Sequence, residues 1–157
     1  MVSSNSSTRF SRIKKNIILT QTDTTVGFLS QDAQKLREIK IRQSSKPFIK
    51  VFHNFKTLQH LNIRIPHKRK KMLRRAKKST FIVKNQAFRI ASYPLHSEIL
   101  RNLEWSYSTS ANQSGKNFER IFCEQKADII IEDKNGLYEG RASKLYKINN
   151  TKIKRLR

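Results

Sequence analysis

Short apolar runs of strand length alternate along the chain with stretches of helical spacing, and this alternation constrains the fold most. The expected strands are residues 16–20, 48–51, 80–83, 87–91, 105–108, 128–131, 143–148 and 152–156. The expected helices are residues 31–41, 55–61, 68–76, 95–103 and 118–124, the first capped by Ser30. Because strands and helices interleave throughout, the pattern predicts an α/β layered sheet.

The length of the chain, 157 residues, fits one domain and leaves little room for two. Nine Phe and many Ile supply a core, and no internal repeat or linker rich in Pro or Gly divides the sequence. We expect a flexible N-terminal segment over residues 1–14, which is rich in Ser, followed by a single domain over residues 15–157.

The sequence lacks both a pair of cysteines and an apolar stretch of membrane-spanning length. Cys123 is the only cysteine, which excludes an intramolecular disulfide and any multi-cysteine zinc site. No apolar stretch approaches the roughly 18 residues of a membrane helix. The sequence therefore predicts a cytoplasmic protein without a membrane partner and without a protein-bound metal.

The net charge of +23, from 34 Lys and Arg against 11 Asp and Glu, predicts a surface that attracts polyanions. A generally basic source proteome would give the same excess without any function. The densest basic run contains Lys68, Arg69, Lys70, Lys71, Arg74, Arg75, Lys77 and Lys78. This run is either a solvated helix or a contact to the phosphate backbone of tRNA or double-stranded RNA.

Three polar segments follow strand or helix ends, where open α/β sheets usually bind ligands. They are Thr22-Asp23-Thr24, in a hydroxyl-rich stretch expected to face outward, residues 40–46, and residues 108–112. The second segment holds Lys40, Arg42 and Lys46, which suit a triphosphate or an RNA backbone. Cations at a helix C-terminus also complement the helix dipole, so this pattern alone leaves both interpretations open.

Taken in order, these segments resemble the signature of the YrdC-like threonylcarbamoyl-AMP synthase family. The family patterns P-T-D/E-T-x-Y-G, K-x-R-x-x-x-K-P and S-x-S-A-N correspond to residues 21–27, 40–47 and 108–112. Arg89 and His96 fall on the family's A-V-R-x-P-x-H-P element, while Ser143 and Arg155 resemble its late S-T-I and L-R-x-G. The resemblance covers roughly residues 16–157, as a short and divergent member.

The resemblance implies a fold and a reaction. The fold would be a single YrdC/RibB-like domain with a twisted, open, mixed sheet flanked by helices. The reaction would join L-threonine, bicarbonate and ATP into threonylcarbamoyl-AMP and release pyrophosphate, which makes the enzyme a nucleotidyltransferase. A tRNA-modifying transferase partner would then move the threonylcarbamoyl group onto tRNA adenosine.

The same resemblance implies two sets of site residues. The ATP and its phosphates would be bound by Lys40, Arg42, Lys46, Asn112 and Arg155. L-threonine would be bound by Thr22, Arg89, Ser110 and Ser143. Mg²⁺ would come with ATP, since no carboxylate cluster marks a metal site of the protein itself.

The sequence departs from the family pattern at several positions. Gln21 replaces the first proline, Val26 replaces the tyrosine, and residues 76–80 replace P-G-P-x-T. Loss of the ring at Val26 is expected either to weaken stacking on the substrates or to reshape the pocket beside them. These departures favour an alternative to the enzyme, namely a non-catalytic relative that binds double-stranded RNA or tRNA.

Overall fold

The computed structural model describes residues 12–40, 47–60 and 63–157 of the chain. The strands are β1 (Ile18–Gln21), β2 (Val26–Ser30), β3 (Ile49–Phe52), β4 (Ser79–Val83), β5 (Gln86–Ile90), β6 (Trp105–Ser110), β7 (Ile129–Ile131), β8 (Lys144–Ile148) and β9 (Ile153–Arg155). The helices are α2 (Ala33–Lys40), α3 (Phe55–His60), the 3₁₀ helix η1 (His67–Arg69), α4 (Lys70–Arg75), α5 (Pro94–Leu103) and α6 (Arg120–Lys126). Within the described ranges, no helix has the length and apolar character needed to cross a membrane.

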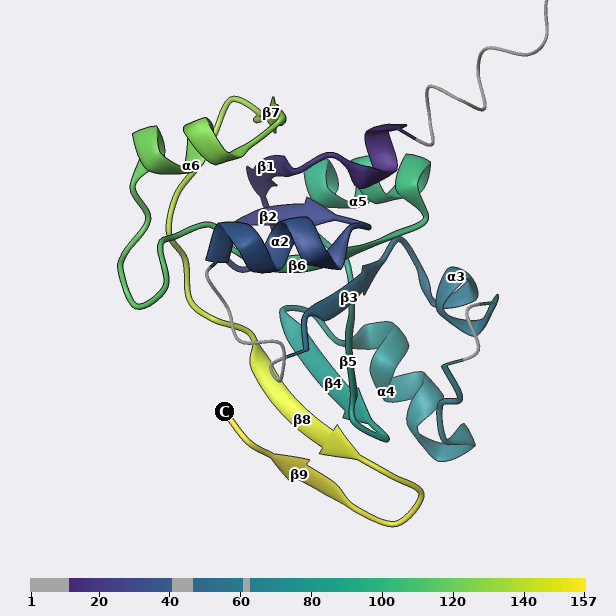
Figure 1. The fold of residues 1–157 in the computed structure, drawn as a ribbon. Helices are drawn as coiled ribbons and strands as arrows, with labels where there is room; N and C mark the ends of the chain where they lie inside the picture. Colours follow the sequence, from purple (N-terminus) through teal and green to yellow (C-terminus); the bar gives the residue numbers. More distant parts are fainter. Residues whose placement is uncertain (1–11, 41–46, 61–62) are drawn as a thin grey trace, which may run out of the picture.

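The strands of these ranges form one sheet in the order β7-β1-β2-β6-β3-β5-β4-β8-β9 (Figure 1). Parallel pairs join β1 with β7, β3 with β5 and β4 with β8. The other neighbouring pairs are antiparallel. This confirms the expected α/β class and the open, mixed sheet flanked by helices.

Each strand and helix expected from the pattern is present within a few residues of its expected ends, but the sequence analysis missed β2. All five residues of β2 are buried, and the strand pairs with β1 on one side and β6 on the other. Its sequence, Val-Gly-Phe-Leu-Ser, has neither clean alternation nor a long apolar run. A glycine inside a short run also weakens the strand signal.

The cap of α2 also differs from the expected one. The side chain of Asp32 accepts hydrogen bonds from the backbone N–H groups of Gln34 (3.0 Å) and Lys35 (3.1 Å). Ser30, the expected cap, instead accepts a bond from the Asp32 N–H at the end of β2. Asp32 is better placed because it directly precedes the first helical residue.

Helices cover both faces of the sheet, and neighbouring residues of one strand point to opposite faces. On one face, Leu29 packs with Ile99 and Leu103 of α5. On the other face, Phe28 packs with Leu36 of α2. A further cluster on that second face joins β3, β4, β5 and β8 to α3 and α4.

The connection between β7 and β8 runs along the sheet and passes the turn between β1 and β2 (Figure 1). The backbone of Tyr138 accepts a hydrogen bond from Val26 N (3.0 Å) and donates one to Oε1 of Gln21 (3.0 Å). At Gly140 a Cβ atom would lie 1.9 Å from the carbonyl oxygen of Thr24. Only glycine therefore fits where this connection crosses the turn.

Candidate active site

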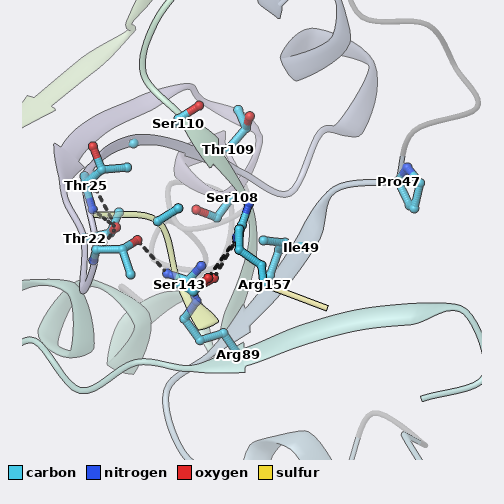
Figure 2. A pocket seen from close by; sticks show the side chains of 13 residues that line it. Thr22, Thr25, Pro47, Ile49, Arg89, Ser108, Thr109, Ser110, Ser143 and Arg157 are labelled. Carbon is cyan, nitrogen blue, oxygen red and sulfur yellow. Dashed lines mark hydrogen bonds between the residues drawn. The ribbon is translucent and has the colours of Figure 1, made fainter. Parts of the chain in front are cut away.

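A pocket of about 270 Å³ opens where the β1–β2 turn, the end of β6 and the connection before β8 meet (Figure 2). It lies on the face of the sheet that carries α5, because Ile49 and Arg89 point to that face. Its lining consists of Thr22, Thr24, Thr25, Gly27, Pro47, Ile49, Arg89, Ser108, Thr109, Ser110, Ala142, Ser143 and Arg157. Hydroxyl groups and two guanidinium groups thus dominate a lining without a carboxylate.

The turn from β1 to β2 places its hydroxyl groups by internal hydrogen bonds. The Oγ1 atom of Thr22 donates to the carbonyl oxygen of Thr25 at 2.6 Å, and the Thr22 N–H donates to the same oxygen at 3.2 Å. Thr22 and Asp23 are only 4% and 5% exposed. The expectation that this segment faces outward is therefore wrong for Thr22 and Asp23, because the turn packs against the start of α5 and the connection before β8.

The Asp23 carboxylate joins this turn to the start of α5. It accepts hydrogen bonds from the N–H and hydroxyl of Ser92 (2.8 and 3.0 Å), the N–H of Tyr93 (2.9 Å) and Nδ1 of His96 (3.1 Å). Burial acts to raise the pKa of Asp23, but His96 and the two backbone donors outweigh burial and lower it below its usual range. Asp23 thus fixes the turn as an ionised group and does not line the pocket.

Arg89 reaches the pocket from β5. Its Nε donates to Oγ1 of Thr80 at 3.2 Å, and one Nη donates to Oγ1 of Thr24 at 3.0 Å. The other Nη has no hydrogen-bond partner among the described residues. Burial lowers the pKa of Arg89, the nearby charge of Arg157 lowers it further, and the charge of Asp23 acts in the opposite direction.

Ser143 connects the two arginines of the pocket. Its hydroxyl shares a 2.8 Å hydrogen bond with Oγ1 of Thr80, the group that also accepts from Arg89. Arg157 donates from Nε to the Ser143 carbonyl oxygen at 3.0 Å and from Nη2 to its hydroxyl at 3.4 Å. Two positive groups therefore converge on one cavity, a geometry that suits a carboxylate or a phosphate.

Four predicted site residues lie together in this pocket. Thr22, Arg89, Ser110 and Ser143, which the sequence analysis assigned to L-threonine, come from four different segments and all line the cavity. Their assignment to L-threonine stays a prediction.

The predicted phosphate ligands Lys40 and Asn112 lie next to the pocket lining rather than within it. The Lys40 ammonium group donates to the carbonyl oxygens of Ser110 (3.0 Å) and Asn112 (2.7 Å) and to Oδ1 of Asn112. The same Oδ1 accepts from the Ser110 hydroxyl at 2.8 Å, and the Asn112 amide donates to the carbonyl of Lys116. In this structure both residues hold the loop that carries Ser110.

The remaining predicted ligands divide into two groups. Arg42 and Lys46 lie outside the described residues. Arg155 is exposed on β9, where its Nε donates to the carbonyl oxygen of Arg157 at 3.1 Å, and it does not line the pocket. Arg157 occupies the pocket instead, a position that the sequence analysis missed. The pair Leu156-Arg157 matches the L-R of the late family motif and would have indicated it.

Val26, where the family pattern has tyrosine, does not line the pocket. Its side chain is 1% exposed and packs with Leu19 and Phe28 in the core beneath α2 and α6. Its neighbours Thr25 and Gly27 do line the cavity. The alternation of a strand thus turns residue 26 away from the pocket, and the expected effect of Val26 on pocket shape finds no support in its packing.

The basic run lies away from this pocket, over η1, α4 and the residues that follow. Lys68, Lys71, Arg74, Arg75, Lys77 and Lys78 are exposed, whereas Arg69 and Lys70 are half-buried. Arg74 lies over the ring of Phe55, 4.4 Å from its centroid, and Arg69 donates to the carbonyl of Asn149. Most of the run is therefore a solvated cationic surface.

Among the residues that the structure describes, no group of three or more His, Cys, Asp or Glu could hold a metal ion. The lining of the pocket itself offers hydroxyl and guanidinium groups, which are poor ligands for Mg²⁺. These residues therefore do not fit a protein-held Mg²⁺ ion.

The fold and the site together define an α/β protein with a hydroxyl-rich pocket that holds two guanidinium groups beside the β1–β2 turn. The family model for Sua5, YciO and YrdC, which is described as "Telomere recombination", matches residues 13–157, and the chain belongs to this family. Among curated protein sequences, none matches the chain significantly.

Solved structures show the same fold. A crystal structure of Sua5 from P. abyssi complexed with L-threonine superposes with a TM-score of 0.77 at 19% identity, over 96% of this chain and 52% of that one. The crystal structure of E. coli YciO superposes with a TM-score of 0.74 at 17% identity, over 96% of this chain and 86% of that one. The chain thus spans about half the length of the Sua5 chain.

Proposed function

We propose that the protein synthesises L-threonylcarbamoyl-AMP from L-threonine, bicarbonate and ATP, for transfer to tRNA adenosine by a partner transferase. One observation carries the proposal. The free Nη of Arg89 and the guanidinium of Arg157 share an acid-free cavity with the hydroxyls of Thr22, Ser110 and Ser143. The complex of P. abyssi Sua5 with L-threonine supports an amino acid as one occupant of such a pocket.

Arg89 is the residue that we assign to the carboxylate of L-threonine. Its Nε and one Nη are held by Thr80 and Thr24, so the guanidinium plane is fixed while the second Nη stays available to a ligand. Burial strengthens such a charge-assisted hydrogen bond. The surrounding hydroxyls can accept from or donate to the amino and hydroxyl groups of the substrate.

The chemistry proceeds in two steps. The threonine amine and bicarbonate give a carbamate and water, and a carbamate oxygen then attacks the α-phosphorus of ATP. The bond from that phosphorus to the bridging oxygen breaks, and pyrophosphate leaves with the electron pair. Because negative charge builds up on pyrophosphate, fixed cations lower the barrier by electrostatics.

Among the residues that the structure describes, Arg157 lines the pocket and is the cation that we assign to the charge of the phosphates. We propose that Arg42 and Lys46 also bind these phosphates. Lys40 and Asn112 would act by holding the Ser110 loop against the substrates. Mg²⁺ would enter with ATP and would not be held by the protein, because the pocket lacks a carboxylate.

Pyrophosphate release from ATP tests this function. With L-threonine and bicarbonate present, the wild-type protein is expected to release pyrophosphate, and omission of either substrate should abolish the release. Arg89→Lys and Arg157→Gln should each lower the rate by about 10²-fold or more, as for loss of one preorganised electrostatic group. Arg101→Gln, an exposed substitution on α5, is the matched control. Threonine-independent release, or full activity of both pocket variants, would refute the proposal.

A second candidate function, binding of tRNA or double-stranded RNA without catalysis, is favoured by the exposed cations of the basic run. Replacing Lys71, Arg75 and Lys78 by Gln should weaken RNA binding and reduce its salt dependence. The slope of log K against log salt concentration should fall by about one unit for each phosphate that the variant no longer neutralises. Gln substitutions at the exposed Lys35, Lys116 and Lys134 remove the same charge elsewhere. Equally weakened binding in both triple variants would indicate general charge attraction only.

A further inference from the structure

A second pocket, of about 190 Å³, opens on the opposite face of the sheet, between α2 and the turn that joins β4 to β5. Lys50 of β3 faces Tyr107 of β6 across the strand pair, and both side chains line this pocket. Ile49, the preceding residue of β3, lines the first pocket instead. The two cavities therefore share strands but lie on different faces.

The rings of Phe48 and Tyr107 and the cation of Lys50 line this second pocket, and Trp105 contacts Tyr107 and Lys50 without lining the pocket itself. Tyr107 contacts Phe48, with ring centroids 6.3 Å apart, and meets Trp105 edge to face at 5.1 Å. The ammonium of Lys50 lies 5.0 Å from the Trp105 ring and 5.5 Å from the Tyr107 ring. The half-buried ring of Tyr107 with an adjacent cation suits a base and its phosphate.

Arg37 of α2 supplies a second cation with an unused donor. Its guanidinium lies 5.9 Å from the Phe48 ring, and its Nε is buried without a hydrogen-bond partner among the described residues. A buried donor left unpaired is unfavourable, so the Arg37 guanidinium is incompletely paired where it lines the pocket. The lining contains no carboxylate that could pair with it.

Two amide side chains complete the lining. Asn85 and Gln86 are exposed at the turn between β4 and β5, where Lys84 and Asn85 both have positive φ angles, 46° and 66°. An amide offers both donors and an acceptor and can form a paired contact with the edge of adenine.

We propose that this second pocket binds a nucleotide. The base would lie against Tyr107, its edge would meet the amides of Asn85 and Gln86, and the phosphate would contact Arg37 and Lys50. The nucleotide is either a free one or an unpaired nucleotide of RNA. The proposal is independent of the function assigned to the first pocket.

Trp105 provides the measurement, because it is the only tryptophan of the chain. Its fluorescence is titrated with AMP, with single-stranded oligoadenylate and with an abasic phosphodiester oligomer of equal length. Quenching by AMP would identify a free nucleotide as ligand, and quenching by oligoadenylate alone would identify RNA. Either result supports the proposal. It would be overturned if neither ligand quenches, or if the abasic oligomer quenches as strongly as oligoadenylate.

Substitutions of residues that line the second pocket test whether the nucleotide binds there. Tyr107→Leu and Arg37→Gln should each weaken binding about tenfold or more, the order expected for loss of a stacked base or of a bond to phosphate. Gln86→Ala should weaken it severalfold, and its exposed position separates this effect from unfolding. Arg101→Gln, with the same loss of charge on the other face, should bind as wild type. Unchanged affinity in both Arg37→Gln and Gln86→Ala would contradict the assignment.

Discussion

Nδ1 of His96 lies 3.1 Å from a carboxylate oxygen of Asp23, and both side chains are fully buried. This pair connects two segments 73 residues apart, the β1–β2 turn and helix α5. The turn carries Thr22 and Thr24 into the pocket, so the pair positions pocket hydroxyls without lining the pocket itself.

Replacing Asp23 by Asn should destabilise the protein most at neutral pH. The folded state lowers the pKa of Asp23, so its contribution is complete above the usual value of 3.8 and is lost as the pH falls through the lower, folded pKa. Asn cannot replace the charged hydrogen bonds that the Asp23 carboxylate accepts from Ser92, Tyr93 and His96, and loss of such a bond costs about 1.5–3 kcal/mol. Urea unfolding should show this difference at pH 7 and a smaller one near pH 3. If the difference in unfolding free energy between wild type and Asp23→Asn does not change with pH, the assigned role of the Asp23 charge is wrong.

Two buried threonines should respond oppositely to replacement by Val. Thr80→Val removes the acceptor of Arg89 Nε and the partner of Ser143, which should cost about 1–3 kcal/mol and weaken binding of L-threonine. Thr20 is equally buried, but its hydroxyl has no partner within the described ranges. Thr20→Val should therefore be neutral or stabilising. Thermal unfolding with and without L-threonine compares the stability of Thr80→Val with that of Thr20→Val. Equal losses of stability in the two variants would contradict the prediction.

Gly140→Ala should disturb the pocket as well as the fold. A Cβ atom there would overlap the Thr24 carbonyl oxygen, so the connection before β8 must shift, at a cost of about 1–3 kcal/mol. Gly115→Ala is the matched control, since its Cβ would meet nothing within 4 Å and only its positive φ of 78° adds strain. Pyrophosphate release should fall in Gly140→Ala and persist in Gly115→Ala. Full activity of Gly140→Ala would show that the close approach of Gly140 to Thr24 is not needed for pyrophosphate release.

Lys40→Met should lower stability in addition to any effect on nucleotide binding. The ammonium group serves two carbonyl oxygens and the side chain of Asn112, and the variant leaves these acceptors without a buried cation. Loss of such charged hydrogen bonds costs about 1.5–3 kcal/mol. Lys35→Met, on the exposed side of α2, is the control. A wild-type melting temperature together with abolished ATP binding would instead make Lys40 a direct phosphate ligand.

Much of the local structure followed from the order of residues. The apolar runs at residues 80–83 and 87–91 became β4 and β5, because a turn with two positive φ angles joins them as a hairpin. The basic run became η1 and α4, since Leu73 could be buried while its charged neighbours stayed in water. By contrast, β2 was missed because its burial comes from pairing on both sides, which no local pattern records.

The pattern of residues predicted the α/β class and the motif segments, and the family resemblance predicted four residues that meet in one pocket, Thr22, Arg89, Ser110 and Ser143. The packing of distant segments, in contrast, places Arg157 rather than Arg155 in the pocket and turns Lys40 inward to the Ser110 loop. The physical reason is the range of the forces involved. The periods of helices and strands depend on neighbouring residues, whereas strand register and buried hydrogen bonds depend on residues far apart in the chain.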